Sequence, residues 1–125
     1  MGYQLFAIAI GGAAGAVSRF LISHWVGENW GTSFPYATLS VNLIGSALIG
    51  VVFVLLLNAS EPAFLRGLVI TGFLGALTTF STFSLDILLL IESGAVLKAG
   101  TYLIANVVGC VLAAGTAFHL TKWAL

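Results

Sequence analysis

Residues 72–84 read GFLGALTTFSTFS, and this stretch decides how the chain folds. It lies inside an apolar block of about 28 residues, from Phe64 to Ile91. One helix of that length would reach roughly 42 Å, whereas the hydrocarbon core of a bilayer is about 30 Å thick. Non-helical backbone survives at membrane depth only where protein buries it or where it lines a wet cavity. We therefore expect a break or kink near Gly75 to Thr79, with a long tilted helix as the alternative.

The composition of the whole chain points to a membrane. The chain has 125 residues, of which 60% are hydrophobic and 6% are charged, and its mean hydropathy is +1.14. An ordinary soluble domain carries about 25% charged residues, so a soluble single domain is excluded. The net charge is zero and no basic or acidic run occurs, which argues against a nucleic-acid partner.

Four apolar blocks follow one another along the chain, at about residues 3–25, 36–57, 64–91 and 99–123. Each is long enough to cross a bilayer, because a spanning helix needs about 20 apolar residues. The N-terminal block lacks the positive region of a signal peptide, so we interpret it as the first span. The sequence predicts an all-α membrane protein with one four-span domain, residues 1–125, surrounded by lipid.

The positive charges are balanced between the two ends of such a bundle. Arg66 and Lys122 fall on the end that holds both termini, and Lys98 and Arg19 belong to the other end. The positive-inside rule then has no bias on which to act. This balance permits insertion in both orientations and an antiparallel homodimer, unless one or two charges or the lipid still select a single orientation.

Polar residues form stripes on three of the spans. The stripes contain Thr38, Asn42 and Ser46 on the second span, Gly75, Thr79, Thr82 and Asp86 on the third, and Tyr102, Asn106 and Cys110 on the fourth. Polar groups inside a membrane are costly and usually face a bundle interior or a pathway. Four close-packed helices leave no lumen, so we expect these stripes to face a partner subunit and to line a path for a small ion.

Structural explanations exist for each of these features when it is taken alone. An intramembrane Asn can join two helices, contributing about 0.6–2 kcal/mol, and a lone hydroxyl can bond to its own helix. Phe80 and Phe83 would ordinarily be core or lipid contacts, although the electropositive edge of a phenyl ring can also face an anion. Gly11, Gly12 and Gly15 are predicted to allow close helix packing.

The motifs together resemble the Fluc/CrcB family of small fluoride channels. The resemblance covers nearly the whole chain, and its most specific part is the third-span motif. It is carried by GGAAGAVSR (Gly11 to Arg19), ATLSVNLIG (Ala37 to Gly45), GFLGALTTFSTFS (Gly72 to Ser84) and the fourth span with Asn106. It implies a multi-pass protein of the bacterial inner membrane that assembles as an antiparallel, dual-topology dimer with two fluoride pores.

The resemblance also implies roles for individual residues. It places Phe80 and Phe83 in the pore with Asn42 as a nearby donor. We expect the hydroxyls of Ser81 and Thr82 to act as further ligands there, and Tyr102 and Asn106 to line the same pore. It implies a structural sodium ion at the dimer centre, bound by the backbone carbonyls of Gly75 and Thr78, and carbonyl oxygens suit such a cation. We expect Arg19, Thr38 and Asp86 to be vestibule or structural residues.

Three departures from the family pattern affect these expectations. Ala37 stands where the family usually has Gly. Asp86 stands where the family usually has Glu and is one methylene shorter, so we expect a contact of this carboxylate to be lost or reached through water. Cys110 and Ala114 replace a Ser and Thr track in the fourth span. This leaves open a paralogue that pairs with this chain in place of a second copy.

We therefore expect a passive channel that exports fluoride from the cytoplasm, and no enzyme, because the sequence has no nucleophile–base pair or carboxylate dyad. The alternative is a small proton-coupled multidrug exporter. That chemistry needs a carboxylate in the first span, where the only charged residue is Arg19. A third class is a non-transporting assembly subunit whose polar stripes only join helices.

Overall fold

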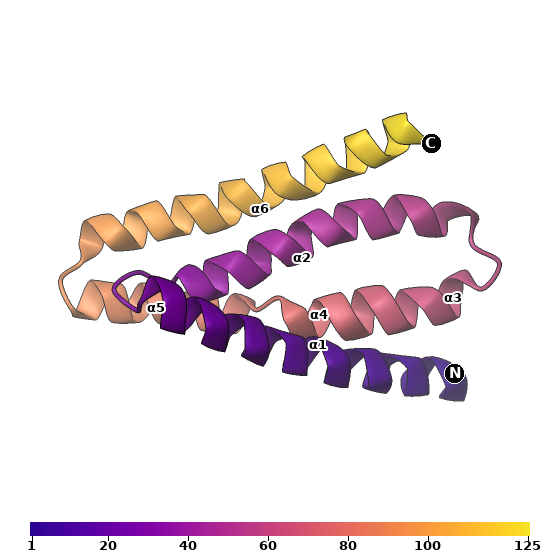
Figure 1. Cartoon of the computed structure of the whole chain (residues 1–125), viewed down its shortest axis with the longest axis horizontal. Helices are drawn as coiled ribbons and strands as arrows, with labels where there is room; N and C mark the ends of the chain where they lie inside the picture. Colours follow the sequence, from indigo (N-terminus) through magenta and orange to yellow (C-terminus); the bar gives the residue numbers. More distant parts are fainter.

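The computed structural model describes residues 1–125, and every regular element in it is a helix. Four helical segments are long and apolar enough to cross a membrane. They run from Gly2 to Trp30, from Tyr36 to Asn58, from Pro62 to Glu92 and from Val96 to Ala124. The two termini and the connection between the second and third segments lie at the same end of the bundle (Figure 1). The chain is therefore a multi-pass membrane protein.

The first helix, α1 (Gly2–Trp30), is longer than the block predicted at residues 3–25. Nothing in the Val26–Trp30 segment breaks the helix, and the Asn29 side chain donates to the Trp25 carbonyl at 2.8 Å. The helix ends only at Gly31, whose φ of 79° is a left-handed conformation that glycine adopts without steric cost.

The third segment changes its conformation along its length. It contains α3 (Pro62–Leu65), the π-helix η2 (Arg66–Leu74), α4 (Gly75–Leu77) and α5 (Phe80–Glu92). Between α4 and α5, Thr78 and Thr79 have extended backbone, with ψ of 156° and 114°. The Thr79 hydroxyl then accepts a bond from the Thr82 amide at 3.1 Å, which caps the start of α5.

Close contact between α1 and η2 depends on two glycines. A Cβ atom at Gly11 would collide with the carbonyl of Leu68, and one at Gly15 would collide with the carbonyl of Phe73. The predicted packing role holds for Gly11 and Gly15 but not for Gly12, where an added Cβ atom would face open space. The two glycines bring the backbones together in the way that small residues do in membrane helices.

The bundle has a small apolar core. Val41 on α2 (Tyr36–Leu55) is fully buried against Leu74 and Leu77. On the other side of α2 lies α6 (Val96–Ala124), where a Cβ at Gly50 would collide with the Ala114 carbonyl. Most large apolar side chains point outward instead. Lipid or another protein chain must cover them.

Candidate functional site

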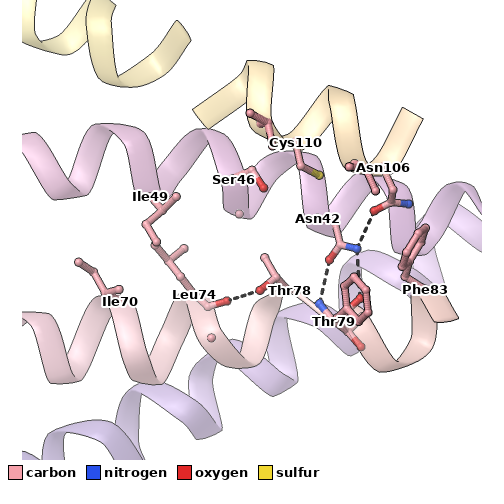
Figure 2. Close-up of a pocket in the computed structure, with 15 residues that line it drawn as sticks. Asn42, Ser46, Ile49, Ile70, Leu74, Thr78, Thr79, Phe83, Asn106 and Cys110 are labelled. Atoms are coloured by element: carbon pink, nitrogen blue, oxygen red, sulfur yellow. Dashed lines mark hydrogen bonds between the residues drawn. The ribbon is translucent and has the colours of Figure 1, made fainter. Parts of the chain in front are cut away.

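An open groove of about 420 Å³ lies between α2, the third segment and α6. Its wall combines apolar side chains with a set of polar groups that come from all three segments (Figure 2). The polar residues lining it are Asn42, Ser46, Thr78, Thr79, Asn106 and Cys110. Parts of the predicted stripes of the three spans therefore meet at this groove. Several predicted residues do not line it, namely Thr38, Ser81, Thr82, Asp86 and Tyr102.

The extended backbone between α4 and α5 is held by one side chain. Asn42 is buried on α2, and its Oδ1 accepts the Thr79 amide hydrogen at 2.8 Å while its Nδ2 donates to the Thr79 carbonyl at 3.1 Å. The side-chain amide thus pairs with both polar groups of a backbone unit that has left the helix. This pairing explains how the interruption is tolerated at membrane depth, where unpaired backbone groups are costly.

Asn106 extends the same network onto α6. Its Oδ1 accepts a second hydrogen bond from Asn42 Nδ2, at 2.9 Å. Its own Nδ2 is buried and has no hydrogen-bond partner. Figure 2 shows the Asn106 oxygen facing Asn42 and the nitrogen turned away from it.

Aromatic rings flank this network. The centroids of Phe80 and Phe83 lie 5.3 Å apart with their planes tilted by 57°, and Phe83 lies equally close to Tyr102. Phe83 is 5% exposed, whereas Phe80 is 75% exposed in the single chain. Phe80 therefore lies in the open part of the groove, and apart from its contact with Phe83 its own chain leaves it largely uncovered.

Asp86 keeps a direct contact despite its short side chain. Its Oδ2 accepts a hydrogen bond from the hydroxyl of Tyr102 at 2.8 Å, and the Tyr102 residue is fully buried. From the sequence we expect the shorter Asp86 side chain to lose a contact or to reach it through water. The structure shows instead that Asp86 contacts Tyr102 directly. The bond joins α5 to α6 beside the groove.

A second cavity of about 340 Å³ lies on the other side of Thr79. It brings together the predicted vestibule residues Arg19 and Thr38 with Thr79 and Thr82. The Thr79 hydroxyl donates to Thr82 Oγ1 at 3.0 Å and lies 3.3 Å from Ser81 Oγ. Thr79 lines both cavities and so connects the cavity lined by Arg19 to the groove, whose lining has no charged side chain.

Two backbone carbonyls at the interruption have lost their usual helical partners. The Thr79 amide donates to Asn42 instead of to the Gly75 carbonyl, and the Thr82 amide donates to the Thr79 hydroxyl instead of to the Thr78 carbonyl. Both Gly75 and Thr78 line the groove. Uncharged oxygens of this kind are suitable ligands for a hard monovalent cation.

The family model described as CrcB-like protein, Camphor Resistance (CrcB), matches residues 6–118. The chain belongs to the CrcB family. Proteins named fluoride-specific ion channel FluC are similar to it over almost their whole length. The relative from Hahella chejuensis is 46% identical over 121 residues, which cover 95% of this chain and 94% of that protein. The one from Azotobacter vinelandii is 47% identical over 117 residues, covering 93% and 94%.

A third CrcB relative, from Pseudomonas fluorescens strain Pf-5, is 45% identical over 119 residues, covering 94% of this chain and 96% of that protein. It carries the same name as the other two. The resemblance drawn from the sequence motifs is therefore confirmed. The names describe ion channels and not enzymes, in agreement with the sequence prediction.

Thr79 has a larger structural part in the site than its place in a polar stripe predicts. Its backbone pairs with Asn42, its hydroxyl caps α5, and the residue lines both cavities. The available signal is the residue type, because Thr is among the preferred N-cap residues of helices. Nothing in the sequence around Thr79 indicates that its partner is Asn42, which lies 37 residues away on α2.

Proposed function

We propose that this chain forms a passive, fluoride-selective channel in the bacterial inner membrane, which lets fluoride leave the cytoplasm down its gradient. The observation that carries the proposal is the groove itself, where paired phenyl rings and a buried amide network meet at an interrupted helix. Membership of the CrcB family supports this proposal, since the relatives are named fluoride-specific channels.

The chemistry of the groove suits a small anion. Fluoride is strongly hydrated, so its passage needs ligands that replace water at short range. Amide hydrogens and the electropositive edges of Phe80 and Phe83 supply such ligands in the groove without a fixed charge. The hydroxyls of Ser81 and Thr82 do not line the groove but contact the Thr79 hydroxyl beside it, and we propose that they extend the path. We expect the channel to reject chloride, because chloride is larger than fluoride and would not fit a narrow site.

A second copy of the chain is proposed to cover the groove. Interrupted backbone and polar side chains do not face lipid in known membrane folds, and here they line an open groove beside the exposed ring of Phe80. Positive charge is balanced between the two ends of the helical bundle, which supports an antiparallel arrangement and two pores per dimer.

We further propose that the carbonyls of Gly75 and Thr78 hold a structural sodium ion where the two copies meet. The loss of both helical partners supports this assignment, because it leaves these two oxygens without their usual donors on residues that line the groove. When bound, the ion would supply a positive charge that joins the two interrupted segments. Replacing sodium by a large organic cation during purification is expected to lower fluoride efflux.

The deciding experiment is ion efflux from liposomes that contain the purified protein. A fluoride electrode should record rapid fluoride release, and a chloride electrode should record no release from matched liposomes. Imposing a proton gradient should leave the fluoride flux unchanged apart from its effect on the membrane potential. Transport that requires the proton gradient would indicate an exporter instead, and the absence of any flux would indicate an assembly subunit.

A further inference from the structure

We propose that the side-chain amide of Asn106 is the donor that fluoride meets in the groove, and that Asn42 is a positioning residue that aims it. The inference rests on the fluoride channel proposed above. It assigns different roles to two asparagines that sequence reasoning placed in the pore as equals.

The orientation of Asn42 follows from the Thr79 backbone. The Thr79 N–H group can only donate, so the Asn42 atom that faces it at 2.8 Å must be the oxygen. The opposite atom of the amide is then Nδ2, which has two hydrogens. One goes to the Thr79 carbonyl at 3.1 Å and the other to Asn106 Oδ1 at 2.9 Å. Asn42 therefore has no hydrogen left for an anion.

The orientation of Asn106 follows in turn. Because its oxygen accepts the bond from Asn42, its nitrogen must point the other way, and Figure 2 shows it turned to the side of Phe83. Asn106 is 5% exposed, and this nitrogen has no hydrogen-bond partner. A buried donor without a partner is costly and rare in folded proteins. The Tyr102 hydroxyl oxygen lies near this amide but makes no hydrogen bond of acceptable geometry with it. A dehydrated anion beside Phe83 would be the partner of this nitrogen.

The other groups on α6 leave Asn106 as the strong donor on this wall. Tyr102 commits its hydroxyl hydrogen to Asp86. Cys110, which lines the groove one turn further along, is only a weak donor. Ala114 has no donor at all on its side chain. The departures of this chain from a hydroxyl track thus concentrate anion binding on α6 at one amide.

Nuclear magnetic resonance of the full-length protein tests this assignment without altering the site. The chain has four asparagines, so selective labelling of asparagine with ¹⁵N gives few side-chain amide signals. Loss of one signal pair in Asn106→Asp and of another in Asn42→Asp assigns the two. Fluoride should shift the Asn106 pair more than the Asn42 pair, and equal chloride should shift neither. A shift confined to the Asn42 pair overturns the proposal.

Efflux from liposomes provides a second test. Asn106→Ala should lower fluoride efflux about 10- to 100-fold, the usual effect of removing a hydrogen bond to an ion, and Asn106→Ser should restore part of it. Asn42→Ala is no substitute for this test, because it also removes the two bonds that hold the Thr79 backbone. Wild-type efflux in Asn106→Ala would contradict the donor role of Asn106.

The two proposals fail in different ways. If the wild-type protein releases fluoride but the Asn106 signals do not respond, the assignment of the donor is wrong and the channel stands. If the wild-type protein releases no fluoride, the function itself is wrong.

Discussion

Asn42 replaces, with one side chain, two hydrogen bonds that an uninterrupted helix would make. Its amide matches the donor and the acceptor of the Thr79 backbone and then reaches Asn106 on α6. The sequence identifies both asparagines as polar groups inside the membrane. It does not pair them, because they lie 64 residues apart and the pairing depends on how three helices pack.

Phe80→Ile should abolish fluoride efflux without unfolding the chain. The ring is 75% exposed in the single chain, so its removal costs little core packing, but isoleucine has no electropositive edge to face an anion. Liposome efflux measured with a fluoride electrode tests this, with size-exclusion chromatography to check assembly. Phe6→Ile, at an exposed ring far from the groove, is the matched control. Equal efflux in both variants would remove Phe80 from the pore.

Tyr102→Phe should destabilise the protein through Asp86. The variant keeps the ring but removes the hydroxyl that donates to Asp86 Oδ2, and an intramolecular hydrogen bond contributes about 0.5–1.5 kcal/mol. Thermal unfolding in detergent should show a lower midpoint than for the wild-type protein. Tyr3→Phe, at an exposed position, should leave the midpoint unchanged. An unchanged midpoint in Tyr102→Phe would mean that the bond adds nothing to stability.

At the scale of elements, the contact between α1 and η2 places the interrupted third segment beside the first helix. The length of the apolar block and its run of hydroxyl residues locate the interruption near Gly75 to Thr79, and the extended residues are Thr78 and Thr79. The π-helical form of η2 has no specific signal in the sequence, since apart from Gly67 and Gly72 its residues are ordinary helix or strand formers. Packing against the glycines of α1 is a tertiary effect.

Glycine substitutions in α1 should separate close packing from helix propensity. Gly11→Ala and Gly15→Ala would drive a methyl group into the carbonyls of Leu68 and Phe73, and overpacking costs about 1–3 kcal/mol. Gly12→Ala is the matched control, because its side-chain position faces open space. Thermal unfolding should show losses for the first two variants only. Equal midpoints in all three would refute the close contact between the helices.

At the scale of the whole molecule, the account requires two copies in opposite orientations. The four spans can be predicted from hydropathy alone, because a bilayer sets a minimum length for each apolar block. The end of α1 cannot be predicted from hydropathy, since the helix continues beyond the apolar block to Gly31. Neither hydropathy nor the length of the helices predicts a dimer. The support for the dimer is the polar groove that the single chain leaves uncovered.

Charge variants should test the opposite orientations. Ala59→Lys with Ser60→Lys adds positive charge to the connection after η1 (Leu56–Asn58), and Thr32→Lys with Ser33→Lys adds it to the connection after α1. Each pair of substitutions should fix one orientation and thereby abolish fluoride efflux when expressed alone. Co-expression of the two double variants should restore efflux. Full efflux from one double variant alone would contradict an antiparallel dimer.

Fluoride selectivity can be measured as the reversal potential of the current that the purified protein carries across a planar bilayer. With a fluoride gradient imposed in one direction and an equal chloride gradient in the other, current should reverse close to the equilibrium potential of fluoride. A reversal potential near that of chloride, or near zero, would contradict a fluoride-selective pore.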